Sequence, residues 1–413
     1  MKRFAVTDST FASRVAQLAA TGSWPEIENS FARAVFSLIT EPGDMFAGAI
    51  TQALSHETVL ELEIARQPTS RLKQLLAEVG ALDEVQSKFV DLDQAHNDAR
   101  QRWSGRLKLQ DFSNALDLAI RVRAQLITVS NSYWPTQLDD LQLASPHCLW
   151  LRSRTELSLL NQNQISIVGS RISTSYGDWV ASEIVADAST KGMNIVSGGA
   201  YGIDAISHRA ALANNNSTIA FMAGGIDRLY PSGNQNLLER IIENGAVIAE
   251  QAPGAMPTKW RFLQRNRLIA AMGQATIVIE AGARSGALNT VTHAQELGRA
   301  VGVVPGPITS QASAGCNQLI AKGMVTPICA ITDAAALALK GEDWFQAEFE
   351  GLGAFETRAL DAMTAKAKPE DKIASDAGLS NRELSIALGQ LALLGFVEKR
   401  ERGWAKLALE RDQ

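Results

Sequence analysis

Glycine-rich segments that directly follow short apolar runs are the parts of this chain best suited to binding chemistry. They read IVGSR (167–171), VSGGAYGID (196–204) and MAGGIDRLYP (222–231). Glycine at a strand end lets backbone N–H groups approach a phosphate, and Arg171 can donate two parallel hydrogen bonds to it. Ligand contacts are therefore expected at Gly169, Ser170, Arg171, Ser197, Gly198, Gly199, Gly202, Gly224 and Gly225. Each segment alone is also typical of a tight structural turn, with Asp204 tying its loop.

The segment TKWRFLQRNRLIAAM (258–272) concentrates positive charge. Its four cations lie within nine residues: Lys259, Arg261, Arg265 and Arg267. Trp260 and Phe262 alternate with them, and no acidic residue occurs between Glu250 and Glu280. Cations that follow a phosphate backbone, with rings for base stacking, favour a groove for single-stranded DNA. The alternative is an amphipathic helix whose arginines are solvated and whose rings pack inward.

A third kind of segment, VIEAGARSGALNT (278–290), ends a strand and begins a helix. Arg284, Ser285 and Gly286 are expected to contact the same phosphate-bearing ligand. Glu280 is open to two interpretations, a structural pairing with a backbone group or arginine, and a catalytic carboxylate.

Several catalytic patterns are absent from the sequence. It has no G-x-x-x-x-G-K-[ST] loop, no H-E-x-x-H and no paired cysteines, so no cofactor, no metal site and no covalent chemistry are expected. His208 and His293 lie in amphipathic helical segments and are expected to form hydrogen bonds that join helices to loops. The chain is predicted not to be an enzyme.

The elements that carry these segments predict an α/β fold with a doubly wound parallel sheet. Apolar, β-branched runs joined by helical segments are typical of strands buried on both faces. The runs lie at 165–170, 194–199, 218–225, 246–250, 275–282 and 300–306. Ligands of such sheets bind beyond the carboxyl ends of the strands, where the glycines stand.

The chain divides into four predicted regions. Residues 1–104 show helical periodicity, 105–340 form the sheet domain, 341–365 form a linker, and 366–413 form a winged helix. In the last region Ser380 and Glu383 form a capping box, and Arg402-Gly403 marks the turn of a two-stranded wing.

Charge is unevenly distributed along the 413 residues. The formal net charge is −5, yet seven cations face two anions between Gln251 and Thr332. Local charge decides which ligand a face attracts, so the net value does not exclude nucleic acid. Three widely spaced cysteines favour no disulfide framework, and no apolar run suggests a secretory signal or membrane span. A cytoplasmic protein without membrane contact is expected.

Taken in order, these motifs resemble the DNA-processing protein A (DprA/Smf) family. The resemblance rests on IVGSR, VSGGAYGIDAISHRAAL, TIAFMAGGIDRLYP, FLQRNRLIA, VIEAGARSGAL and VPGPITSQASAGCNQLI, and it covers about residues 160–330. It implies an extended Rossmann-like fold that binds single-stranded DNA without sequence preference. It also implies protection of incoming strands in natural transformation, loading of RecA and a homodimer. The implied DNA contacts include Lys259, Phe262, Arg265, Asn266 and Arg267.

The chain departs from the family pattern in its second glycine loop, where Tyr201 replaces a usual arginine. One phosphate contact is lost there, although the ring can stack on a base. The alternative function is a Rossmann enzyme that cleaves nucleoside monophosphates, but the P-G-G-x-G-T element of such enzymes is absent from EAGARSGALNT. A third hypothesis is a sensor of a small nucleotide.

Overall fold

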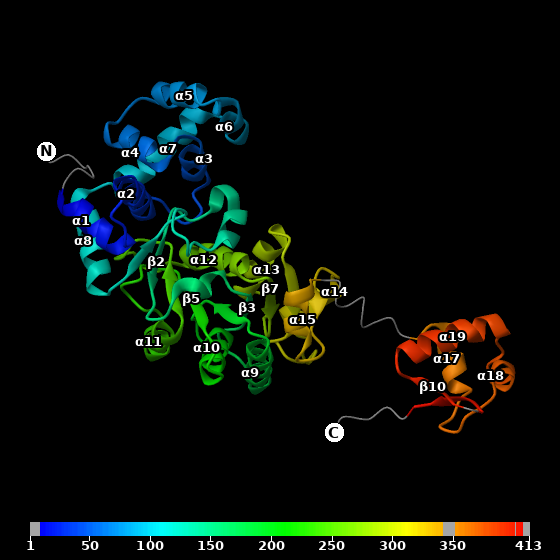
Figure 1. The fold of residues 1–413 in the computed structure, drawn as a ribbon. Helices are drawn as coiled ribbons and strands as arrows, with labels where there is room; N and C mark the ends of the chain where they lie inside the picture. The colour runs from blue at the N-terminus through cyan, green and yellow to red at the C-terminus, as the bar shows by residue number, and fades with distance from the viewer. Residues whose placement is uncertain (1–8, 342–351, 401, 408–413) are drawn as a thin grey trace. The chain divides into compact units, whose positions relative to one another are not determined.

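A computed structural model describes residues 9–341, 352–400 and 402–407 (Figure 1). The chain divides into two compact units, residues 1–341 and 342–413. The larger unit contains the sheet and the N-terminal helices, and the smaller unit contains the C-terminal helices.

A nine-stranded sheet, in the order β1-β2-β6-β5-β4-β3-β7-β8-β9, forms the centre of the larger unit. All six strands predicted from the sequence are present: β3 (Gln164–Val168), β4 (Asn194–Ser197), β5 (Thr218–Met222), β6 (Ala246–Ala249), β7 (Ala275–Val278) and β8 (Ala300–Val303). They pair in parallel, and nearly all of their residues are buried. The predicted α/β fold is confirmed.

Three further strands extend this sheet at its edges. They are β1 (Gln125–Ile127), β2 (Leu149–Arg152) and β9 (Thr326–Pro327), and β2 runs antiparallel to β6. The sequence did not indicate them because runs of two to four residues are too short to show a period of two.

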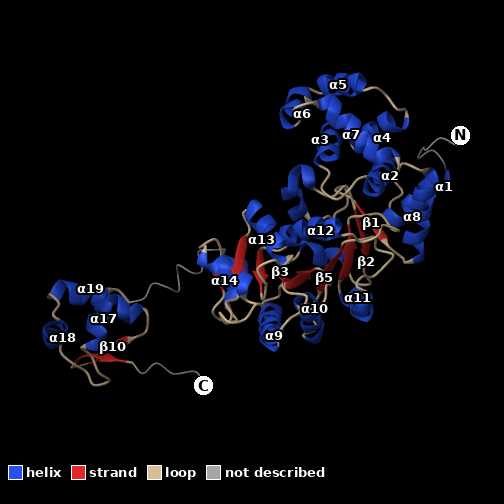
Figure 2. Cartoon of the chain, turned by 180° about the vertical axis from the view of Figure 1, so that it is seen from behind, coloured by secondary structure: helices blue, strands red, loops and turns tan. Residues whose placement is uncertain are grey.

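Helices cover both faces of the sheet (Figure 2). One face carries α9 (Ser175–Thr190), α10 (Ile203–Ala213) and α11 (Gln235–Asn244), with α15 (Asp333–Lys340) packed on α9. The other carries α12 (Lys259–Met272) and α13 (Ala287–Glu296), whose apolar residues join the core of that face. Shorter elements are α14 (Ala314–Ala321), η1 (Thr136–Ala144), η2 (Leu157–Asn161) and η3 (Ser232–Asn234).

Strand order reverses at β3, because β4 lies on one side of it and β7 on the other. The chain builds β3 to β6 outward in one direction and then returns to place β7 beside β3. Such a reversal leaves a crevice at the carboxyl ends of the two neighbouring strands. The segments after β3 and β7 therefore flank a preformed binding position.

The N-terminal region is helical, as predicted, but extends beyond residue 104. It comprises α1 (Ser9–Ala19), α2 (Trp24–Ile39), α3 (Met45–Leu54), α4 (His56–Ile64), α5 (Thr69–Glu78), α6 (Leu82–Lys88), α7 (Leu92–Ser104) and α8 (Leu109–Arg121). The ring of Phe112 in α8 packs 5.2 Å from that of Phe31 and 5.7 Å from that of Phe11. These contacts place α8 with the first helices, so the predicted boundary at 104/105 divides one packed cluster.

The same cluster continues into the sheet, so the helices and the sheet share a core. It includes Trp150 of β2 and Val247 of β6 together with α2 and α8. The indole nitrogen of Trp150 donates to Ser37 Oγ of α2 at 3.0 Å. The two regions predicted as separate domains thus fold as one unit.

The smaller unit contains α17 (Ala354–Asp361), α18 (Glu370–Ala377), α19 (Asn381–Leu393), β10 (Val397–Arg400) and β11 (Gly403–Lys406). The predicted capping box of Ser380 and Glu383 is present, and β10 pairs with β11 in antiparallel fashion. The assignment of this unit as a winged helix stays a prediction.

The predicted linker 341–365 needs a correction in its second half. Helix α17 lies there, and Ala359, Leu360 and Met363 are buried in the core of the smaller unit. Its acidic composition concealed this apolar stripe. Residues 342–351 lie outside the described part of the chain.

Candidate nucleic-acid interface

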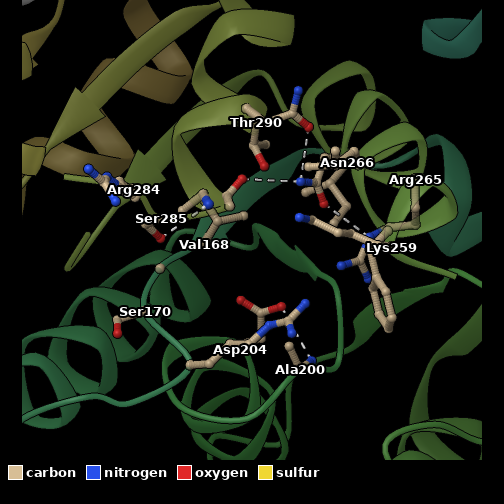
Figure 3. Close-up of a pocket in the computed structure, with 18 of the residues that line it drawn as sticks. Val168, Ser170, Ala200, Asp204, Lys259, Arg265, Asn266, Arg284, Ser285 and Thr290 are labelled. Atoms are coloured by element: carbon tan, nitrogen blue, oxygen red, sulfur yellow. Dashed lines mark hydrogen bonds between the residues drawn. The ribbon is translucent and has the colours of Figure 1, made fainter. Parts of the chain in front are cut away.

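A cavity of about 1000 Å³ opens at the carboxyl ends of β3 and β7 (Figure 3). Its wall comes from the segments after these strands and from the first half of α12, with Ala200, Asp204 and Tyr230 closing one side. We call it the switch-point pocket. Ten of the predicted ligand contacts line it: Gly169, Ser170, Arg171, Lys259, Phe262, Arg265, Asn266, Arg284, Ser285 and Gly286.

Three of these residues supply free positive charge. Arg171, Lys259 and Arg284 come from three separate segments and are exposed. Across the described ranges, none of them has a carboxylate partner within 4.0 Å. The guanidinium carbon of Arg171 lies 5.1 Å from the centre of the Phe262 ring. The pocket therefore holds three exposed cationic groups, one of which lies beside an aromatic ring.

Arg267 does not line the pocket, and its side chain is committed to the fold, so its DNA contact stays a prediction that this geometry does not support. Its guanidinium donates two hydrogen bonds to the Glu250 carboxylate, at 2.6 and 2.8 Å, and others to Ala144 O at 2.8 and 3.1 Å. Only 2% of the residue is exposed. Arg261 is occupied in the same way, because it forms two hydrogen bonds of 2.9 Å with Glu41 of the N-terminal region.

Arg265 lines the pocket but is committed to its wall. Its Nη1 donates to Gly198 O and Phe221 O, both at 2.7 Å. Burial lowers the pKa of Arg265 to about 10, and the nearby Asp204 carboxylate opposes that shift. The side chain thus holds the loop after β4 against the strand β5.

The orientation of α12 is therefore opposite to the alternative named from the sequence, in which the arginines are solvated and the rings pack inward. Arg261, Arg265 and Arg267 are buried, whereas Trp260 is exposed. Lys259 is the cation that this helix leaves for a ligand. The pairing partners Glu41 and Glu250 are too far away in sequence to be recognised from the local pattern.

Six other predicted contacts are not among the residues that line the pocket, and their DNA contacts stay predictions. They are Ser197, Gly198, Gly199, Gly202, Gly224 and Gly225, none of which lines the pocket. Ser197 Oγ donates to Ile167 O at 2.6 Å. A side chain on Gly198 would overlap the Arg265 guanidinium, and one on Gly202 would overlap Ser170 O. These glycines allow close packing of the loops and leave the ligand surface to their neighbours.

Ser170 reaches the pocket with its hydrogen-bonding groups already in use. Its backbone N–H donates to Glu280 O at 2.7 Å, and its hydroxyl donates to Ile172 O at 2.7 Å. One of the N–H groups that the sequence suggested for a phosphate is therefore occupied. The exposed side chains of Arg171, Lys259 and Arg284 are the cationic groups that this pocket offers to an anion.

Both acidic residues near the pocket have structural partners. Glu280 accepts hydrogen bonds from Thr174 N at 2.9 Å and Thr174 Oγ1 at 2.6 Å, and it does not line the pocket. This geometry favours the structural interpretation of Glu280. Asp204 accepts from Ala200 N at 3.3 Å, and burial raises its pKa although Arg265 opposes the shift.

The histidines form hydrogen bonds within the fold. His208 Nδ1 lies 2.7 Å from Thr218 Oγ1 of β5, and burial lowers the pKa of His208 to about 3. His293 Nδ1 lies 3.2 Å from Glu296 Oε2 on the same helix.

Sequence reasoning did not assign Tyr230, Asn289 and Thr290 to the site, although all three line the pocket. They occur within the segments 222–231 and 278–290 that the glycines marked, so the signal was their place beside the predicted contacts. Asn289 Oδ1 accepts from Asn266 Nδ2 at 3.2 Å, which fixes the amide of Asn266 at the wall.

No cluster of metal-ligating side chains occurs among the residues described. Within those same ranges, no helix has both the length and the apolar character needed to cross a membrane.

Comparisons with known proteins agree on one family. The family model described as DNA recombination-mediator protein A matches residues 125–338. A Mycobacterium tuberculosis relative, "Putative DNA processing protein DprA", is 35% identical over 361 residues, which cover 83% of this chain and 91% of the relative. The "DNA processing protein DprA" of Streptococcus pneumoniae is 38% identical over 194 residues, covering 47% of this chain and 64% of the relative.

A solved structure supports the same assignment. The X-ray structure of DNA processing protein A from Streptococcus pneumoniae is similar with a TM-score of 0.57 and 25% identity, and the match covers 75% of this chain and 97% of that chain. With the family model matching more than half of the 413 residues, the chain belongs to the DNA recombination-mediator protein A (DprA/Smf) family, whose role is DNA processing and recombination.

Proposed function

We propose that the switch-point pocket binds single-stranded DNA without sequence preference. The observation that carries this proposal is that Arg171, Lys259 and Arg284, all exposed and without a carboxylate partner within the described residues, line one pocket together with Phe262, whose ring lies beside Arg171. Cations attract the phosphate backbone, and an aromatic ring stacks on any of the four bases. Non-specific binding follows because neither group reads a base edge.

A single strand fits this pocket better than a duplex. Bases in a duplex are stacked and paired, so their faces cannot reach Phe262, which stands in the wall of a cavity. Unpaired bases can turn toward the ring while their phosphates meet the cations. Preference for single strands is therefore expected from access to base faces.

Membership of the family supports the finer parts of the proposal. We propose that the chain protects incoming strands during natural transformation, loads RecA onto them, acts as a homodimer in the cytoplasm, and performs no covalent chemistry. These assignments come from the resemblance stated for the family.

The test is a salt-titrated comparison of a labelled oligothymidine with a duplex of equal length. Each neutralised phosphate of a single strand contributes about −0.7 to the slope of log K against log salt, so three cations predict a slope of about −2. Arg171→Ala is expected to weaken binding about tenfold, because it removes one charge-assisted hydrogen bond, and to make the slope shallower by about 0.7.

The matched control is Arg240→Ala, which removes an exposed cation of α11 outside the pocket. It is expected to change neither the affinity nor the slope appreciably. The pocket would be excluded as the strand-binding site if Arg171→Ala and Arg240→Ala changed the affinity equally. Equal affinity of the wild-type protein for single strand and duplex would exclude it as well.

The alternative enzyme would need a carboxylate free to act on a nucleoside monophosphate. The Glu280 carboxylate accepts a hydrogen bond from Thr174. The Asp204 carboxylate accepts one from Ala200 and lies near the buried Arg265. We expect no release of free base when the protein is incubated with nucleoside monophosphates. A small-nucleotide sensor would instead bind a mononucleotide tightly and a long oligomer not at all.

A further inference from the structure

Two exposed tyrosines stand on neighbouring loops at the rim of the switch-point pocket. Tyr201 follows Ala200, a residue of the pocket wall, and is 47% exposed. Tyr230 lines the pocket and is 45% exposed. The sequence contains only four tyrosines, so half of them are gathered at this rim.

The two rings continue the aromatic surface that begins inside the pocket. The centre of the Tyr230 ring lies 5.8 Å from that of Phe262, with the planes inclined by 52°. Tyr201 lies against the segment that follows Tyr230, because a Cβ placed on Gly233 would be 2.6 Å from Tyr201 Oη. Tyr230 therefore connects Phe262 in the pocket with the loop against which Tyr201 packs.

Hydrogen bonds fix the backbone of the loop that carries Tyr201 and join it to the loop that follows Tyr230. The buried side chain of Asn234 donates to Gly199 O at 3.0 Å and to Ala200 O at 3.1 Å. Asp204 accepts from Ala200 N on the other side of the loop. The rings consequently project from fixed positions, which lowers the conformational entropy lost when a ligand stacks on them.

The hydroxyl groups at the rim have no structural task among the described residues. Neither Tyr201 Oη nor Tyr230 Oη forms a hydrogen bond there, whereas Tyr176 Oη donates to Pro305 O at 2.8 Å. Each tyrosine packs one part of its ring against the fold and leaves nearly half of its surface exposed. Their gathering beside a cationic pocket points to a ligand that is both anionic and aromatic.

We propose that Tyr230 and Tyr201 form a stacking platform for the bases of a single DNA strand that leaves the switch-point pocket. The proposal rests on the proposed function and extends it from the pocket to the rim. Phosphates of the strand meet Arg171 and Lys259 in the pocket, while the next bases lie on the two rings. At position 201 the chain therefore contacts a base face and makes no phosphate contact.

The test compares an oligothymidine with an abasic strand of the same length, which has the same phosphates and no bases. Tyr201→Ala is expected to weaken binding of the oligothymidine about tenfold, because one stacked base is lost, and to leave the abasic strand unaffected. Tyr201→Phe is expected to retain wild-type affinity, since the ring is preserved. Tyr133→Ala is the matched control, because Tyr133 is 41% exposed and lies outside the pocket.

A reciprocal variant tests the kind of contact. Tyr201→Arg exchanges a ring for a cation, so it is expected to strengthen binding of the abasic strand and to steepen its salt slope by about 0.7. Thermal unfolding of each variant checks the fold, and Tyr201→Ala is expected to be harmless because the side chain is half exposed.

The outcomes separate the platform from the pocket. The platform is overturned if the Tyr201→Ala variant binds both strands like wild type, or if it loses affinity for both strands equally. In either case the wild-type protein still binds single strands, so the proposed function stands. A wild-type protein that binds neither strand overturns the proposed function itself. Selective loss of the oligothymidine supports both.

Discussion

The four cations of α12 meet different surroundings at the scale of single residues. Lys259 is exposed at the pocket, whereas Arg261 and Arg267 pair with Glu41 and Glu250. Arg265 is buried and donates to two backbone carbonyl groups. A paired and buried guanidinium adds little field at a distance, because its partner carries the opposite charge. The attraction for a polyanion therefore comes from Lys259 together with Arg171 and Arg284.

Arg267→Ala is predicted to act on stability. It would leave the buried Glu250 carboxylate without its partner, which typically costs about 3–5 kcal/mol of unfolding free energy. Urea denaturation measures that loss. The double variant Arg267→Ala/Glu250→Gln should recover part of it, because the unpaired charge is gone, and Arg171→Ala should lose little because it is exposed. A stable Arg267→Ala protein with weakened DNA binding would contradict this assignment.

Buried histidines predict a loss of stability in mild acid. Burial lowers the pKa of His208 and His147 to about 3, below the ordinary value of 6.5. The unfolded chain then binds more protons than the folded chain between these values, so their stabilising effect is complete above pH 6.5 and falls as the pH drops toward 3. Each histidine contributes a slope of up to about 1.4 kcal/mol per pH unit.

Unfolding free energies measured from pH 7.5 to pH 5 test this. His208→Gln is expected to reduce the slope by one such contribution, since glutamine does not titrate. An unchanged slope in that variant would show that His208 is not the group responsible.

At the scale of elements, contacts between residues far apart in the sequence join the N-terminal helices of the larger unit to α12. Glu41, which lies between α2 and α3, receives hydrogen bonds from Arg261 of α12. A Cβ on Gly43 would lie 2.7 Å from Gln264 Oε1, also on α12. The N-terminal region therefore fixes the helix that presents Lys259 and Phe262.

Removal of the N-terminal helices is predicted to abolish folding of the sheet. A chain of residues 122–341 would expose the apolar cluster that α2 and α8 share with β2 and β6. Circular dichroism and gel filtration are expected to show an aggregated or unfolded protein, whereas residues 1–341 should unfold cooperatively. Cooperative unfolding of 122–341 at the temperature of the longer chain would restore the boundary predicted near residue 104.

Local patterns predicted the elements better than their contacts. Strands such as β3 and β7 are recognisable because apolar, β-branched runs end in glycine, and the capping box at Ser380 marks α19. The pocket could be predicted because its segments follow neighbouring parallel strands. The burial of Arg267 and Arg261 could not, since Glu250 and Glu41 approach α12 only after the chain has folded.

At the scale of the whole molecule, the pocket belongs to the larger unit alone. Its wall is drawn from residues 168–290, and the unit ends at Gly341. Every cation and ring invoked for strand binding lies within that range.

Residues 1–341 are therefore predicted to bind single-stranded DNA with the affinity and salt slope of the full chain, within about threefold, which corresponds to less than 0.7 kcal/mol. Fluorescence anisotropy with the same labelled oligomer measures both. Residues 352–413 alone serve as the complementary sample. A loss of more than tenfold on removal of the smaller unit would mean that the strand contacts it as well.

The excess of cations between Gln251 and Thr332 affects how the protein and a DNA strand first approach each other. The net charge of −5 repels a polyanion, whereas the exposed cations of the pocket attract one. Such an uneven field selects collisions by orientation before any contact forms, and added salt weakens both the repulsion and the guidance. For the proposed pocket, we therefore expect an approaching strand to be turned toward the exposed cations before the first contact forms.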